Sequence, residues 1–181
     1  MNVLEQLTIV AALVAGGALQ AARAADGALP VPSSLTVDAS LPRARADAAV
    51  LAARHFYAFW DTGEESFLAA AIAPRFTDRT LPRGRPQGPD GPAFASKGFR
   101  ASVPDLRCEI RQLIVGGDRV VAHLRFTGHF IGTFGGKRGS GQLVDFIATD
   151  ILRIADGDVI ENWHIEDNLA LMQQLGAVGS N

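Results

Sequence analysis

Two carboxylates that stand among apolar residues are the first candidates for chemistry in this sequence. Asp150 lies in the run 142–154, whose alternate residues fall on one mostly apolar face of a strand. Asp167 ends the run 159–167, in which alternation places it on the same face as Trp163. An ionised carboxylate on an apolar face costs free energy unless it is paired or hydrogen-bonded. Such a group is therefore either satisfied by a partner or chemically active.

Each carboxylate has a structural interpretation beside the chemical one. Burial beside Phe146 would make Asp150 a useful general acid or base, whereas an arginine or hydroxyl partner would make it structural. Asp167 directly precedes Asn-Leu-Ala-Leu and is a good helix N-cap, so it can also catalyse only if one of its oxygens stays free. His164 and Glu166 fall on the opposite face from Asp167, which predicts that they point outward, toward solvent or a partner subunit.

Three other side chains have two interpretations each. Tyr57, the only tyrosine, lies in an aromatic stretch and either packs in the core or lines a cavity with its hydroxyl. His129 belongs to a polar strand face but borders the glycine-rich segment 132–141, where a bend could turn it into a pocket. Cys108, the single cysteine, excludes an intrachain disulfide and is expected as a buried small residue rather than a nucleophile.

Composition and spacing exclude several classes of function. The 181 residues are 48% hydrophobic and 20% charged, which is ordinary for one globular domain. A net charge of -2 gives no electrostatic footprint for nucleic acid or an anionic membrane. No histidine, cysteine or carboxylate set has metal-ligand spacing, so no metal site is predicted.

The N-terminus predicts export to the periplasm. Residues 7–22 are almost wholly apolar or small, and Ala22-Arg23-Ala24 has the pattern of a signal-peptide cleavage site. The segment before them carries Glu5 and no basic residue, so an anchored N-terminus or a misassigned start codon remain alternatives. We therefore assign 1–24 as a signal peptide and the proline-containing segment 25–42 as a linker.

The remaining residues, 43–177, predict one α+β domain. Helices are expected first, then a meander of antiparallel strands, then a short final helix. The expected helices are 43–60, 64–73, a stretch from 91 or 92 to 104, and 168–175; the expected strands are 107–115, 119–131, 142–154 and 159–166. Helices packed on one face of a strongly bent sheet would leave a pocket between the two layers.

An ordered set of motifs resembles the SnoaL-like polyketide (ester) cyclase family. The motifs are Ala73-Pro74-Arg75-Phe76, Val103-Pro104-Asp105-Leu106, Gly117-Asp118-Arg119-Val120, Asp150-Ile151-Leu152-Arg153-Ile154, Ile160-Glu161-Asn162-Trp163-His164 and Leu171-Met172-Gln173-Gln174-Leu175-Gly176. The similarity covers roughly residues 46–176. One departure concerns Arg79, which follows Phe76-Thr77-Asp78 where many members carry a histidine.

The resemblance implies a fold, a site and a chemistry. The fold would be a nuclear transport factor 2-like cone, in which N-terminal helices and a curved antiparallel sheet enclose one deep apolar pocket. In the cyclases of this family a pocket carboxylate acts as general acid/base in an intramolecular aldol closure without a cofactor. The family's Trp-x-x-x-Asp tail motif falls on Trp163 and Asp167, and Asp150 falls on the acidic position of the preceding strand.

We therefore predict catalytic roles for Asp167 and Asp150, and substrate contacts for Trp163, Tyr57, Phe146 and His129. The reaction would be an isomerase- or lyase-type step on a small hydrophobic carbonyl compound, with no cofactor. A non-catalytic exported binding protein with the same pocket is the alternative. A homodimer formed through the open face of the sheet is compatible with both.

Overall fold

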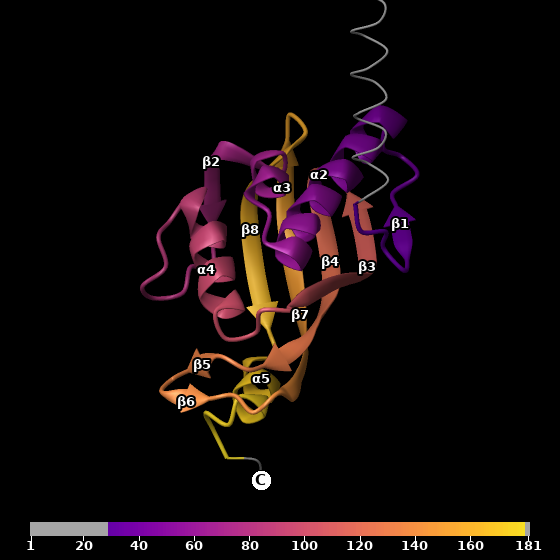
Figure 1. Cartoon of the computed structure of the whole chain (residues 1–181). Helices are drawn as coiled ribbons and strands as arrows, with labels where there is room; N and C mark the ends of the chain where they lie inside the picture. The colour runs from indigo at the N-terminus through magenta and orange to yellow at the C-terminus, as the bar shows by residue number, and fades with distance from the viewer. Residues whose placement is uncertain (1–28, 180–181) are drawn as a thin grey trace, which may run out of the picture.

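A six-stranded sheet forms the frame of the molecule (Figure 1). The structure is a computed structural model that describes residues 29–179. Its strand order is β1-β3-β4-β7-β8-β2. The strands are β1 (Leu35–Val37), β2 (Ile72–Asp78), β3 (Arg107–Gly116), β4 (Arg119–Phe130), β7 (Gln142–Ala155) and β8 (Asp158–Glu166). The central four form an antiparallel meander, while the edge strands β1 and β2 run parallel to their neighbours. The expected α+β fold is confirmed.

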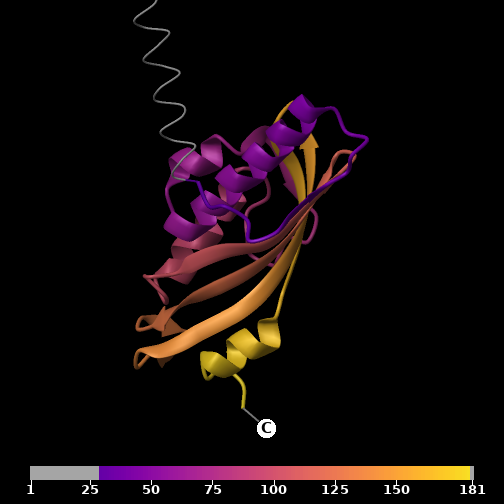
Figure 2. The ribbon, with the colours of Figure 1, turned by 90° about the vertical axis from the view of Figure 1, so that its right-hand side faces the viewer.

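The helices between β1 and β3 cover one face of this curved sheet, whereas the C-terminal helix lies apart from them at the sheet's lower end (Figure 2). The longest, α2 (Arg43–Thr62), ends at Gly63, whose N–H donates to the carbonyl of Phe59 and whose φ of 80° turns the chain out of the helix. The shorter helices are α3 (Glu65–Ala69), α4 (Asp90–Arg100) and α5 (Asn168–Gln174), and a separate small hairpin joins β5 (Thr133–Phe134) to β6 (Lys137–Arg138). Aromatic residues of α2 and alternate residues of β4 and β7 make the core between the layers. None of the helices within residues 29–179 is long and apolar enough to span a membrane.

Both edge strands differ from the elements expected there. The helix expected over 64–73 stops at Ala69, and β2 follows, with Pro74 inside it. A proline fits an edge strand because it removes only an outward donor, and the pairing of β2 with β8 is irregular between Ile72 and Thr77. At the other edge, β1 forms within the segment expected as a linker. Arg54 fastens this segment by donating to the carbonyls of Leu29 and Pro30, each at 3.0 Å.

An extra residue in β8 changes which side chains face the helices. Arg153 lies opposite Glu161 while Ile154 lies opposite Val159, so one step along β7 matches two steps along β8. Such a β-bulge reverses the alternation beyond it. The expectation that Val159, Trp163 and Asp167 share the inward face is therefore wrong. The even-numbered residues from Asn162 onward face inward instead.

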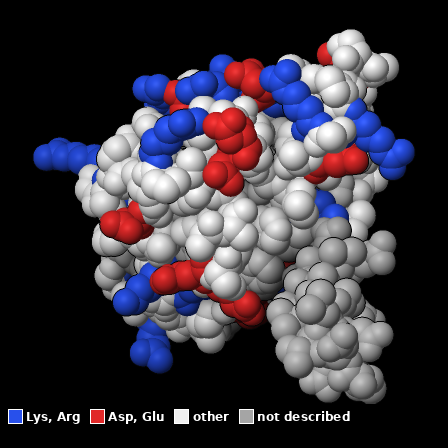
Figure 3. Space-filling model, turned by 90° about the horizontal axis from the view of Figure 1, so that it is seen from above, with Lys and Arg blue, Asp and Glu red and all other residues white. Residues whose placement is uncertain are grey.

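The outer face of the sheet carries exposed apolar side chains. Leu143, Ile147 and Ile151 of β7 and Ile165 of β8 are all exposed there. This is the surface that the predicted homodimer would use, and dimerisation stays a prediction. Elsewhere, acidic and basic side chains are interspersed, as the end of the molecule in Figure 3 illustrates.

The expected signal peptide, 1–24, lies outside the described residues, and export stays a prediction. N-terminal sequencing of the protein isolated from its native cells should find a chain that begins at Ala25, because cleavage is expected after Ala24. Recovery of a chain that still begins at Met1 would contradict this expectation.

Glu161 should make the stability of the folded protein depend on pH in the acidic range. Its carboxylate is buried on the outer side of β8 and accepts hydrogen bonds from Arg153 and from Arg79, the latter at 2.9 Å from Nε. These bonds, that of Arg153 foremost, lower the pKa of Glu161 to about 2. Because the folded pKa lies below the ordinary 4.5, the stabilisation is full above pH 4.5 and is lost as the pH falls toward 2.

Thermal unfolding between pH 7 and pH 2 tests this. Glu161→Gln should unfold several degrees lower than the wild type at pH 7, because two arginines lose their shared carboxylate, and the difference should shrink as the pH approaches 2. Glu109→Gln is the matched control, since Glu109 pairs with Arg111 at a half-exposed position. A difference for Glu161→Gln that does not change with pH would contradict the assignment.

Candidate active site

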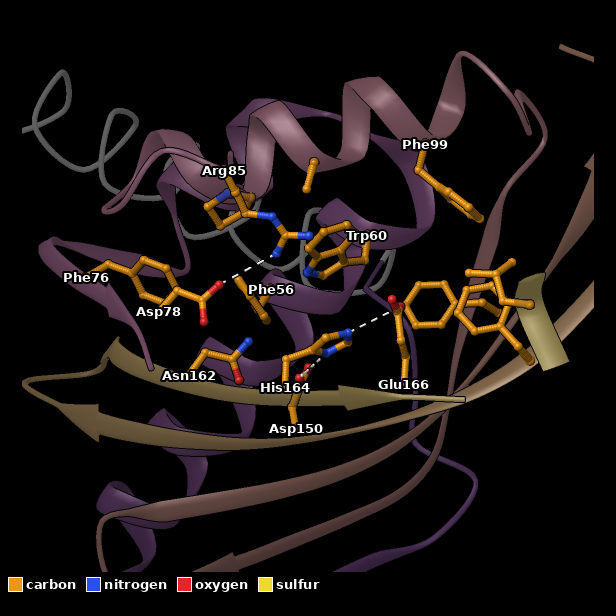
Figure 4. Close-up of a pocket in the computed structure, with 15 residues that line it drawn as sticks. Phe56, Trp60, Phe76, Asp78, Arg85, Phe99, Asp150, Asn162, His164 and Glu166 are labelled. Carbon is orange, nitrogen blue, oxygen red and sulfur yellow. Dashed lines mark hydrogen bonds and ion pairs between the residues drawn. The ribbon is translucent and has the colours of Figure 1, made fainter. Parts of the chain in front are cut away.

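A cavity of about 110 Å³ lies between the inner face of the sheet and the helices (Figure 4). Its apolar lining comes from Phe56, Trp60, Phe76, Pro92, Ala95, Phe99, Phe126, Phe146 and Leu171. Phe126 and Phe146 are opposite each other on β4 and β7, and their rings stack at 5.2 Å between centroids. Six polar residues also line the cavity: Asp78, Arg85, Asp150, Asn162, His164 and Glu166. An apolar cavity with a few convergent polar groups is typical of a ligand site.

Asp150 is buried at the cavity wall with both carboxylate oxygens engaged. The residue is 1% exposed. Its Oδ2 accepts a hydrogen bond from the hydroxyl of Tyr57 at 3.1 Å, and its Oδ1 lies 2.7 Å from Nδ1 of His164. Burial, followed by the charge of Asp150, raises the pKa of Tyr57 well above its usual 10, so the hydroxyl stays a donor.

His164 is held between two carboxylates. The β-bulge places it directly opposite Asp150, and its second ring nitrogen, Nε2, lies 3.4 Å from Oε2 of Glu166. Burial alone would lower the pKa of His164, but the charge of Asp150, its hydrogen bond and the contact with Glu166 together raise it to about 10. At neutral pH the ring is therefore a cation that donates from both nitrogens.

The structure brings three of the sequence-predicted residues to this site. Asp150 and Phe146 line the cavity, and Tyr57 reaches Asp150 through its hydroxyl while its ring packs in the core. Asp150 was expected to be either a general acid or base or a carboxylate satisfied by a partner. The structure provides such partners, the hydroxyl of Tyr57 and the ring of His164. Of the two interpretations of Tyr57, core packing is the one that the structure shows: the residue is fully buried, and its hydroxyl donates to Asp150 rather than lining the cavity.

The other three predicted residues lie elsewhere. Asp167 is exposed and its Oδ1 accepts from the backbone N–H of Ala170 at 3.0 Å, so the expected N-cap is confirmed. Trp163 lies on the outer face of the sheet, beneath the guanidinium of Arg119 at 5.6 Å. His129 is half-exposed on the same outer face and contacts Asp105 at 2.7 Å. The structure does not bring these side chains to the cavity.

His164 and Glu166 were expected to face outward, and that expectation is wrong. The turn at Asp156 and Gly157 pairs Ala155 with Asp158, and simple counting from that pair sets Asp150 opposite residue 163. The extra residue of the bulge shifts this position to 164. The order Asp-Val-Ile-Glu-Asn contains no glycine or other clear signal of a bulge. Only a three-dimensional constraint, such as the need to satisfy buried Asp150, would have pointed to His164.

Within residues 29–179, no group of three or more histidine, cysteine, aspartate or glutamate side chains has the arrangement of a metal site. Cys108 is buried as expected, and burial, followed by the charge of Asp150, raises the pKa of its thiol well above 9.

Comparison with known proteins places the chain in a family. A sequence model of the SnoaL-like polyketide cyclases matches residues 50–175. The chain belongs to the SnoaL-like polyketide cyclase family. Its fold is of the nuclear transport factor 2-like type that the sequence motifs implied. No protein of curated function matches the sequence.

Solved structures agree with this assignment. A candidate polyketide cyclase from Bacillus cereus is similar at 45% identity and a TM-score of 0.77, over 84% of this chain and 96% of that one. TsrD from Streptomyces laurentii is 29% identical with a TM-score of 0.66, over 77% and 100% of the two chains. IdmH, a candidate polyketide cyclase from Streptomyces antibioticus, shares the fold at 23% identity and a TM-score of 0.63, over 73% and 98%.

NMR titration of the histidine ring protons should show that His164 stays charged well above neutral pH. A pKa raised to about 10 means that the ion pair stabilises the fold fully below the ordinary 6.5, and that this contribution is lost as the pH rises through about 10. In Asp150→Asn the pKa of His164 should fall to near or below 6.5, because burial then dominates.

Asp105→Asn is the matched control, since it removes the carboxylate beside the half-exposed His129 and should leave His164 unchanged. The signal of His164 is assigned by its absence in His164→Gln. A wild-type ring that titrates near 6.5 would contradict the ion pair.

Proposed function

We propose that this SnoaL-like protein catalyses proton transfer next to a carbonyl group of a small hydrophobic compound, without a cofactor. One observation carries the proposal: His164 projects into an apolar cavity between a buried carboxylate, Asp150, and a carboxylate that is partly exposed, Glu166. Membership of the polyketide cyclase family supports the same class of chemistry.

His164 is suited to stabilise an enolate. Its Nε2 lies 3.4 Å from Glu166, which is long for a hydrogen bond, so this contact is weak. A substrate carbonyl oxygen could replace Glu166 as the acceptor and receive a charge-assisted hydrogen bond from the imidazolium. A donor of this kind, fixed in a site that excludes water, lowers the energy of the charge that develops on the oxygen.

Glu166 is suited to take the proton. Its side chain is 30% exposed, and its Oε1 has no partner within the described chain. A carboxylate with a free oxygen at the edge of a cavity can act as a general base. Asp150 has a different role in this proposal, because both of its oxygens already accept hydrogen bonds: it orients His164 and keeps it protonated.

The step balances without a further reactant. Glu166 removes the proton from the carbon next to the carbonyl, the electron pair of that C–H bond forms a C=C bond, and the carbonyl oxygen takes the negative charge or a proton from His164. The enolate carbon then attacks a second carbonyl of the same molecule, which closes a ring, and the proton held by Glu166 passes to the new alkoxide. Without a second carbonyl, Glu166 returns its proton to the enolate, and its return to a conjugated carbon isomerises the compound.

A binding protein without catalysis is the second candidate. The two carboxylates named from the sequence are both engaged, Asp150 by Tyr57 and His164, and Asp167 by its helix cap. If Glu166 takes no proton, the same cavity would simply hold a ligand.

Exchange of carbon-bound hydrogen in D₂O tests the proposal without knowledge of the natural substrate. The probe is phenylacetone, a one-ring ketone, and the loss of its benzylic protons is followed by ¹H NMR at neutral pD. The wild type should accelerate exchange, whereas Glu166→Gln and His164→Gln should each slow it by about 100-fold, the usual effect of removing one general base or one oxyanion donor. Asp150→Asn should also slow it, because His164 then loses its charge at neutral pH.

Asp167→Asn is the control, since asparagine is also a good N-cap and this position lies away from the cavity. It should leave exchange unchanged. Loss of exchange in Asp167→Asn but not in Glu166→Gln would overturn the assignment of the base. A wild type that binds phenylacetone but does not accelerate exchange would favour the binding protein.

A further inference from the structure

The cavity has a second polar end, separate from the His164 pair. Figure 4 shows Asp78, Arg85 and Asn162 on one side of His164, and Glu166 on the other. Asp78 ends β2, and Asn162 is its neighbour on β8. Arg85 reaches them from the loop between β2 and α4. The chemistry proposed above uses none of these three side chains.

Asn162 is a buried amide that lacks a partner. The residue is 7% exposed, and its Oδ1 is fully buried without a hydrogen bond to any described residue. Its side-chain nitrogen, Nδ2, has no hydrogen-bond partner in residues 29–179 either, but it is not fully buried, so it is the atom of this amide that a bound molecule can reach (Figure 4). A buried polar group left unpaired costs free energy, and native proteins retain few of them. At a cavity wall, the unpaired Nδ2 is explained if a bound molecule supplies an acceptor for it.

Arg85 brings unused donors to the same place. Its side chain is 25% exposed, and its interaction within the described chain is one ion pair, from Nη1 to Oδ2 of Asp78 at 3.6 Å. That distance is too long for a good hydrogen bond, and a guanidinium has five N–H donors. Gln87 fixes the loop by accepting from the backbone N–H of Asp78 at 2.8 Å and donating to its carbonyl. Arg85 is thus held beside the cavity with donors to spare.

The charges of the cavity favour a neutral ligand group at this end. Three carboxylates line it, Asp78, Asp150 and Glu166, against two cations, Arg85 and His164. An added carboxylate would make this excess of negative charge larger. A hydroxyl suits this end, because its oxygen has two lone pairs that can accept from Nδ2 of Asn162 and from Arg85, while its hydrogen can donate to the carboxylate of Asp78.

We propose that Asn162 and Arg85 bind a neutral hydroxyl group of the substrate while its carbonyl lies at His164. Asn162 and His164 are two residues apart on the same face of β8, which separates them by about 6.6 Å along the strand. The substrate is therefore a hydroxy ketone whose two oxygens are several bonds apart, with an apolar body between them against the aromatic lining. The carbonyl part of this inference rests on the proposed function; the hydroxyl part does not.

Binding of a matched pair of ketones tests the inference. The probes are phenylacetone and 4-hydroxyphenylacetone, which differ by one hydroxyl at the far end of the ring. Titration is followed by calorimetry and by the fluorescence of Trp60, which lines the cavity, in a Trp163→Phe background that leaves one tryptophan. The wild type should bind the hydroxylated ketone about tenfold more tightly, as expected for one satisfied hydrogen-bonding site.

Asn162→Leu and Arg85→Met should each bind the two ketones about equally, with phenylacetone affinity kept. Ser96→Ala is the matched control: the hydroxyl of Ser96 is also buried without a partner in the described residues, but it does not line the cavity. It should keep the preference. Arg85 lies on a loop, so its variant remains informative if Asn162→Leu folds poorly.

Equal affinities in the wild type, no measurable binding of 4-hydroxyphenylacetone, or a preference that survives in Arg85→Met would each overturn the inference. The outcome is separable from that of the exchange experiment. A hydroxyl preference without exchange refutes the proposed catalysis and leaves this subsite in place, and exchange without a preference does the reverse.

Discussion

The ion pair between Asp150 and His164 is the constraint on which the rest of the site depends. The two residues lie opposite each other on the neighbouring strands β7 and β8, and Tyr57 of α2 donates a hydrogen bond from its hydroxyl to Asp150. Removing His164 would leave the carboxylate of Asp150 buried without its counter-charge, and removing Asp150 would make His164 lose its proton, so the fold depends on having both partners. The fold therefore has to keep β7, β8 and α2 in fixed positions relative to one another. The same rigidity is what a catalytic or binding group needs.

The apolar lining strengthens this arrangement. The phenylalanines of α2, α4, β4 and β7 line the cavity beside the ion pair, and this apolar surrounding weakens its electrostatic attraction less than water at a surface would. They also leave a ligand few places at which to form hydrogen bonds. The orientation of a ligand in the cavity then depends on the two polar ends, which differ in character. At one end His164 lies between two carboxylates, and at the other the amide of Asn162 lies beside the guanidinium of Arg85.

Much of the fold could be predicted from the sequence, because its central elements follow simple periodicity. The alternation of β7 correctly placed Asp150 on the inner face, and the residue after β8 was correctly recognised as a helix cap. The edge strands β1 and β2 were missed because edge strands are short and tolerate proline, so they lack a strong pattern. The site was predicted in part. Asp150, Tyr57 and Phe146 were named, whereas His164, Glu166 and Asn162 were not, since one unpaired residue upstream reverses every position that alternation assigns.

The bulge in β8 separates the shape of the cavity from the pairing of its polar groups. It lies between the hairpin turn and the site, and Ile160 is the residue that has no counterpart on β7. A chain that lacked this residue would still pair Glu161 with Arg153 and His164 with Asp150, because the turn and the site would keep their registers. What would change is the curvature of the strand, since bulges bend and twist the strands that contain them. The shape of the cavity can therefore change with the length of this hairpin by one residue while Asp150 and His164 stay paired.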